Sequence, residues 1–142
     1  MRNNRGMTLI EILLVLGLML LIFSIIIPQK QGIDEDLLLY QTVVTIENTL
    51  KLARHLSIDE STTYRMDVQD QRVTLRKYLL NTEPVYTFEI PANISVSITT
   101  DNVVSFNRNG ASGYNRILVE NTKQERYIIE TSIGTGRINI SR

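Results

Sequence analysis

Hydrophobic and polar residues divide this 142-residue chain into three regions with different periodicity. The first region is an almost unbroken apolar run over residues 7–27, in which Glu11 is the only charged residue. At about 1.5 Å per residue, a helix of this length measures about 30 Å, which matches the hydrocarbon core of a bilayer. The pattern therefore predicts a membrane-spanning helix over residues 7–28.

The second region, residues 29–61, carries apolar residues at alternating steps of four and three, which places them on one helix face. The members of this stripe are Leu39, Val43, Ile46, Leu50, Ala53 and Leu56. We expect an amphipathic helix whose stripe packs against a sheet. Whether it continues the first helix stays open, because Pro28 is expected to kink the chain and Gly32 lies in a polar stretch.

From residue 62 onward the apolar residues alternate with polar ones, which is the period of a β-strand. Residues 64–68 and 72–76 flank Gln69-Asp70-Gln71 and predict a hairpin. Further strands are expected at residues 85–90, 94–99, 103–106, 116–120, 127–131 and 137–141, separated by turn-forming residues. The order of elements predicts an α+β fold, in which the second half of a long helix packs on an antiparallel β-rich head over residues 62–142.

Charges on either side of the apolar run set its expected orientation. Arg2 and Arg5 precede it, whereas an acidic stretch at residues 34–36 follows it, so the N-terminus is expected in the cytoplasm and the head outside. A cleaved secretory signal would end in a small-x-small site, which the Ile27-Pro28 end lacks. We therefore expect a retained single-pass anchor in the cytoplasmic membrane.

Glu11 is the costly residue of the run, because an acidic side chain at the centre of a membrane helix costs roughly 2.5–3.5 kcal/mol. One interpretation is a capping box, since Thr8-Leu9-Ile10-Glu11 fits the S/T-x-x-E pattern of a helix start. The other is a functional carboxylate that pairs with a buried cation. The two roles are compatible.

The N-terminal residues resemble the class III signal of type IV pilins and pseudopilins: a basic leader over residues 1–6, then Gly6-Met7-Thr8-Leu9-Ile10-Glu11 and an apolar helix. In that family a prepilin peptidase cuts after the glycine and methylates the new N-terminus. The resemblance implies cleavage between Gly6 and Met7 and methylation of Met7. It also implies that Glu11, the fifth mature residue, pairs with the amine of a neighbouring subunit, and that Pro28 kinks the helix.

The C-terminal pattern resembles the heads of minor pseudopilins of the GspH and FimT type. It consists of Phe106-Asn107, a loop through Gly110, two strands and Gly134-Thr135-Gly136-Arg137-Ile138. The small head and the absence of cysteine are similar to competence pseudopilins of the ComGD type.

These resemblances imply a non-enzymatic structural subunit of a competence pseudopilus that serves DNA uptake in transformation and is displayed at the cell surface. Its expected partners are the prepilin peptidase, other major and minor pseudopilins, and the assembly platform protein with its ATPase. An alternative within the class is a minor subunit of a type IV pilus or a type II secretion system.

The sequence contains few candidates for catalytic or metal-binding residues. The chain has no cysteine and a single histidine, His55, with no acid pair or metal-ligand spacing near it. Gly134-Thr135-Gly136 lacks the Lys-Ser/Thr of a phosphate loop and precedes a strand, so a turn explains it better. We expect no enzyme activity, no metal and no cofactor.

A membrane-anchored DNA-binding adaptor is the alternative from another class. Arginines gather in the last third of the chain and would contact phosphates if the fold brought them together. The candidates for DNA contact are Arg108, Arg116, Arg137 and Arg142. Glutamates are interleaved with them, so ordinary solvated strand faces are the competing interpretation. The chain's 15 basic and 15 acidic residues imply no global attraction to nucleic acid.

Overall fold

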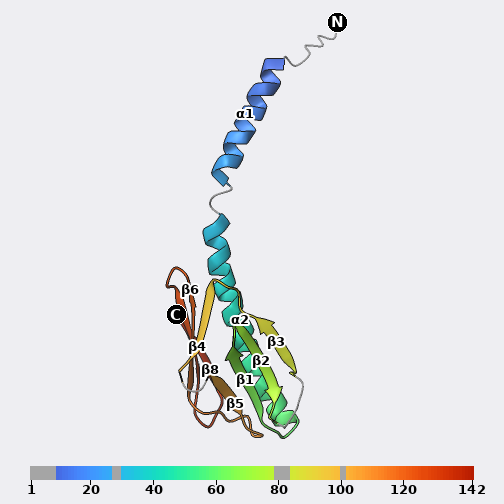
Figure 1. Cartoon of the computed structure of the whole chain (residues 1–142), viewed down its shortest axis with the longest axis vertical. Helices are drawn as coiled ribbons and strands as arrows, with labels where there is room; N and C mark the ends of the chain where they lie inside the picture. Colours follow the sequence, from blue (N-terminus) through green and yellow to red (C-terminus); the bar gives the residue numbers. More distant parts are fainter. Residues whose placement is uncertain (1–8, 27–29, 79–83, 100–101) are drawn as a thin grey trace. The chain divides into compact units, whose positions relative to one another are not determined.

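The computed structural model describes residues 9–26, 30–78, 84–99 and 102–142 (Figure 1). The chain divides into two compact units, one through residue 34 and one from Glu35 to Arg142. Helix α1, Leu9–Ile26, belongs to the first unit, and helix α2, Lys30–Asp59, begins in it. The second unit, called the head below, holds the rest of α2 and the strands.

The head contains two antiparallel four-stranded sheets in its described residues. The first sheet has the order β3-β2-β1-β5 and the second the order β4-β6-β7-β8. The strands are β1 Tyr64–Gln69, β2 Arg72–Lys77, β3 Tyr86–Glu89, β4 Ile94–Ile98, β5 Val103–Phe106, β6 Asn115–Asn121, β7 Arg126–Thr131 and β8 Ile138–Ser141. Each lies within one or two residues of the strand expected from the alternating pattern.

One hydrophobic core joins α2 to both sheets. The predicted stripe is confirmed, since five of its members are buried and Leu56 packs partly buried against them. The sheets contribute the alternate residues of their strands, such as Met66, Val104, Ile117 and Ile129, which are all fully buried. Figure 1 shows strands of the first sheet drawn over α2, with the second sheet beside them. The expected α+β class is thus confirmed.

Polar residues on the buried side of α2 satisfy their hydroxyl groups within the helix. The hydroxyls of Thr42, Thr45 and Thr49 each donate to the carbonyl four residues earlier, at distances of 2.7–2.8 Å. This local bond lets Thr42 and Thr49 enter the core without an unpaired polar atom.

The predicted hairpin of β1 and β2 is confirmed, with Gln69 opposite Arg72 and a two-residue turn between them. Both turn residues, Asp70 and Gln71, have positive φ, at 49° and 58°. Two successive positive φ values define the type I′ turn, whose twist matches that of the paired strands. The alternation of apolar and polar residues predicted the hairpin, although the turn lacks the usual Asn-Gly or Asp-Gly pair.

Two short connections link the sheets at the end of the head where α2 ends. Ser112 forms an antiparallel bridge to Phe106 of the first sheet and a parallel bridge to Ile133, next to the second sheet. At the other end, the turn between β6 and β7 contacts α2 through Lys123, whose Nζ lies 3.5 Å from Glu35. The Lys123 contact holds the turn between β6 and β7 against the helix.

Candidate assembly surface

Helix α1 exposes apolar side chains around its whole circumference. Leu9, Ile10 and Leu20 are 79%, 74% and 70% exposed. Other large apolar side chains exposed on α1 are Ile12, Leu13, Leu14, Val15, Leu16, Leu18, Met19, Leu21 and Ile22. A helix that is apolar on all sides requires an apolar environment, which is either lipid or the surfaces of other helices.

Glu11 is the only ionisable residue of α1 and lies in its first turn. The backbone N–H groups at the start of a helix have no partner within the helix, and their dipoles favour a carboxylate there. The other N-terminal residues with expected roles, Gly6, Met7, Thr8 and Pro28, lie outside the described residues. The cleavage site, the methylation site, the capping box and the kink therefore stay predictions.

The expected membrane span of residues 7–28 also extends past the described residues at both ends. Within the ranges that the structure describes, no helix is both long enough and apolar enough to cross a membrane.

Two of the candidate DNA-contacting arginines form ion pairs within the second sheet. Arg116 on β6 lies opposite Glu130 on β7, with its Nε 3.8 Å from the carboxylate. Tyr114 donates its hydroxyl to the same carboxylate at 2.8 Å, and this hydrogen bond raises the pKa of Tyr114 above its usual range. Arg142 lies 3.6 Å from Glu125.

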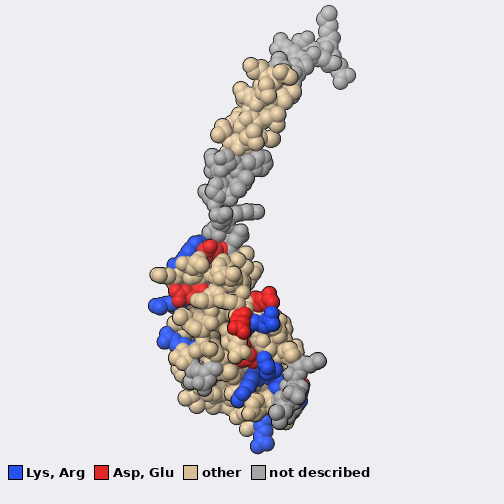
Figure 2. Space-filling model, viewed as in Figure 1, with Lys and Arg blue, Asp and Glu red and all other residues tan. Residues whose placement is uncertain are grey.

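The four candidate arginines do not share one sheet face. Arg116 and Arg137 have the strand parity of the solvent face, whereas Arg142 follows the opposite parity and lies over the ring of Tyr127, 5.5 Å from its centroid. Arg108 is exposed in the loop after β5. Figure 2 shows basic and acidic side chains interspersed on the drawn face of the head. This arrangement of the four arginines does not test the expected DNA contact, which stays a prediction.

The described residues contain no group of three or more His, Cys, Asp or Glu side chains that would hold a metal ion. His55 is exposed on α2.

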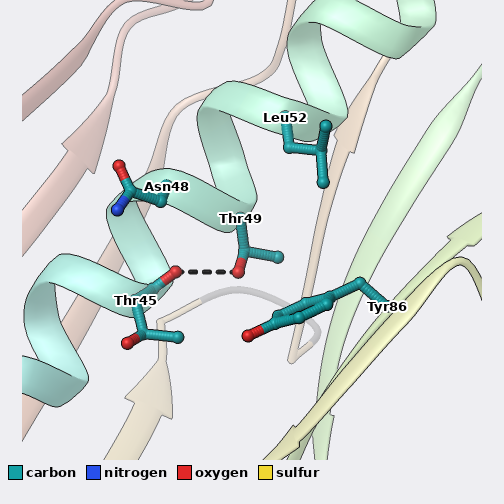
Figure 3. A pocket seen from close by; sticks show the side chains of 5 residues that line it. All are labelled: Thr45, Asn48, Thr49, Leu52 and Tyr86. Carbon is teal, nitrogen blue, oxygen red and sulfur yellow. Dashed lines mark hydrogen bonds between the residues drawn. The ribbon is translucent and has the colours of Figure 1, made fainter.

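A cavity of about 300 Å³ lies between α2 and β3, at the edge of the first sheet (Figure 3). Thr45, Asn48, Thr49 and Leu52 of α2 line one side, and the ring of Tyr86 on β3 closes the other. Sequence reasoning missed this feature. The alternating pattern placed Tyr86 on a strand, but no local signal shows which helix residues face it.

Comparison with known proteins relates the fold of this chain to solved structures. No family model and no curated protein sequence matches the chain. The fold resembles that of the type IV minor pilin FimU of Pseudomonas aeruginosa strain PAO1, with a TM-score of 0.62 and 10% identity. The match covers 79% of this chain and 91% of FimU, and in a second crystal form of FimU it covers 72% and 92%.

The fold also resembles that of the minor pseudopilin EpsH from the type II secretion system of Vibrio cholerae. This match has a TM-score of 0.58 and 9% identity, and it covers 72% of this chain and 94% of EpsH. At such low identity the likeness shows the fold. The pilin-like fold expected from the sequence is therefore confirmed, while the likeness to ComGD-type subunits stays a prediction.

Proposed function

We propose that this chain is a minor pseudopilin, made as a precursor in the cytoplasmic membrane with its N-terminus in the cytoplasm and its head outside. The observation that carries the proposal is the exposed apolar surface of α1, which precedes a head with the pilin fold. Such a surface suits two environments in turn. It first contacts lipid and then contacts the helices of neighbouring subunits in a filament.

In this proposal a prepilin peptidase cuts between Gly6 and Met7 and methylates the new amine of Met7. That ammonium group lies four residues before Glu11 in the sequence. In a filament core, the carboxylate of Glu11 in one subunit neutralises the Met7 amine of its neighbour. A buried charge without a partner is costly, so this pair selects one axial register among the many that apolar side chains alone would permit.

We assign the filament to a competence machine that takes up DNA for transformation. The assignment rests on the small cysteine-free head and its C-terminal motif. The partners in this proposal are other major and minor pseudopilins, the assembly platform protein and its ATPase. The fold likeness to FimU and EpsH favours a second candidate, a minor subunit of a type IV pilus or a type II secretion system.

Intact mass and N-terminal sequence test the processing step. We expect loss of residues 1–6 and addition of one methyl group only when the chain is expressed with a prepilin peptidase. A chain that stays uncut with an active peptidase would contradict the proposal. Deleting the gene then distinguishes the two candidate functions. Loss of transformation with normal pili and secretion would support the competence assignment. Loss of pili or secretion with normal transformation would support the second candidate.

Glu11→Gln tests the charge pairing. This variant should be cut normally but should enter filaments poorly, because the Met7 amine of the neighbour loses its partner. Glu89→Gln is the matched control, since Glu89 is an exposed carboxylate on β3 of the head. Filament incorporation is measured by shearing and immunoblotting. Equal incorporation of both variants would contradict the role of Glu11.

A further inference from the structure

The edge strand β8 differs from the other three sheet edges of the described head. On β5, Phe106 is bridged by Ser112, and on β4 both end residues, Ile94 and Ile98, are buried. On β3, Tyr86 closes the cavity against α2. In β8 three of the four residues are exposed, as they are in β3, and no described strand pairs with the outer side of β8.

The register of β8 shows which backbone groups point outward. The N–H of Ser132 donates to the carbonyl of Arg137 at 2.9 Å, so Arg137 belongs to a hydrogen-bonded pair with β7. In an antiparallel ladder such pairs alternate along the strand. Ile138 and Ile140 therefore direct their N–H and C=O groups away from β7. An extended segment placed along this edge would find a donor and an acceptor at each of these two residues.

The side chains at this edge are apolar on the core side and polar on the other. Ile138 packs partly buried against the core, and Ile140 remains 39% exposed. Asn139 and Ser141 have the opposite parity and face solvent. A strand added to the edge would therefore cover Ile140 with its own inward-facing side chains, which removes apolar surface from water.

Two arginines flank the edge. Arg137 makes no ion pair among the described residues, whereas Arg142 pairs with Glu125 at 3.6 Å and lies over the ring of Tyr127. Antiparallel pairing of two copies of β8 in the register that pairs Ile138 with Ile140 would place Arg137 opposite Ser141 of the other copy, so self-pairing gives neither arginine an anionic partner. A strand that carries acidic residues near the two arginines would instead be attracted. The charges thus favour an acidic partner.

We propose that the open edge of β8 is a docking site for an extended, acidic segment of another protein, which adds a fifth strand to the second sheet. Because Arg137 and Arg142 are five residues apart, the segment has two acidic residues at the same spacing. Apolar residues occupy the positions opposite Ile138 and Ile140. The expected pattern in antiparallel pairing is acidic-x-apolar-x-apolar-acidic. The site does not require the proposed processing or filament function.

The probe is a fluorescent peptide with the sequence ETITVE, titrated onto the full chain in detergent micelles at low salt. We expect it to bind about tenfold more tightly than KTITVK, because two attractive contacts become repulsive. Added salt should reduce this difference. N-methylation of the peptide at its Ile and Val should abolish binding, since it removes the donors that face the edge. Amide exchange should slow at Ile138 and Ile140 when the peptide binds.

Substitutions in the protein test the location. Arg137→Gln should weaken binding of ETITVE about threefold, and Arg142→Gln should weaken it less, because Glu125 already shares that guanidinium. Arg126→Gln is the matched control on the neighbouring strand and should leave binding unchanged. Equal binding of the two peptides, tolerance of N-methylation, or no binding at millimolar concentration would overturn the proposal.

Discussion

Gly136 lies backbone against backbone with Gly110, so that a Cβ atom on Gly136 would overlap the carbonyl oxygen of Gly110. A Cβ on Gly110 would itself lie 2.7 Å from Cδ1 of Ile58 and 3.3 Å from Cγ of Arg54, both on α2. Both glycines have positive φ, at +59° and +72°. Only residues without a side chain allow the β7–β8 hairpin, the loop after β5 and the end of α2 to meet this closely.

Gly136→Ala should lower the free energy of unfolding by roughly 3 kcal/mol, because it adds steric overlap to an unfavourable φ. Gly134→Ala separates the two effects, since φ is +76° there but a Cβ meets nothing within 4 Å. We expect it to cost about 1 kcal/mol. Gly113→Ala, in open space without positive φ, should be nearly neutral. Denaturant titration measures the free energy of unfolding of the three variants. Similar losses of stability for Gly134→Ala and Gly136→Ala would contradict the close contact.

Thr131→Val should destabilise the head by about 1–3 kcal/mol, because it leaves buried polar groups without a partner. The hydroxyl of fully buried Thr131 donates to the carbonyl of Gly113 at 2.9 Å. It also accepts from the backbone N–H of Asn115 at 3.1 Å and from the Asn115 amide at 3.2 Å. Thr131→Ser retains the hydroxyl and should lose less stability. A smaller loss for Thr131→Val than for Thr131→Ser in denaturant titration would contradict the role of the hydroxyl.

Alkaline pH should weaken the head through Tyr64. Burial, together with a hydrogen bond to Glu60, raises the pKa of Tyr64 to about 12. Its stabilising contribution is complete below the unfolded pKa of about 10 and is lost as pH rises toward 12, because the unfolded chain ionises first. The expected loss is about 2–3 kcal/mol. Tyr64→Phe removes this titration, so the difference in pH slope between the two proteins measures it, and identical slopes would contradict it.

Gln71→Gly should stabilise the hairpin of β1 and β2 by up to about 1 kcal/mol. Gln71 is the second residue of the type I′ turn and has φ of 58°, a conformation that glycine adopts without steric cost. Its carbonyl still accepts the N–H of Ile90 at 2.7 Å, which the substitution preserves. Thermal unfolding measures the gain. Gln69→Gly, within β1, is the control and should destabilise the head instead.

Local patterns allowed most elements to be predicted. The stripe from Leu39 to Ala53 predicted the buried face of α2, and alternation predicted each described strand to within one or two residues. Helix and strand periods depend on residues close together in the chain, so a short window of sequence contains the necessary information. The same holds for α1 and Glu11, whose apolar surroundings are a property of consecutive residues.

The order of the strands in the two sheets could not be predicted from local patterns. Nothing local to β4 shows that it pairs with β6, or that β5 returns to β1, because pairing partners depend on how the whole core closes. The close contact between Gly110 and Gly136 also depends on the whole fold, since 26 positions separate two turns that meet only in the folded head.

The sequence by itself therefore determined the helices, the strands, the apolar character of α1 and the position of its single carboxylate, because these follow from neighbouring residues. Only the tertiary structure decided which strand edges stay open. Arg137 and Arg142 appeared in the sequence as members of a diffuse basic region, and the order of the second sheet places them at the two ends of an edge strand. That placement requires long-range packing of β7 against β8 and β6, which no local pattern encodes.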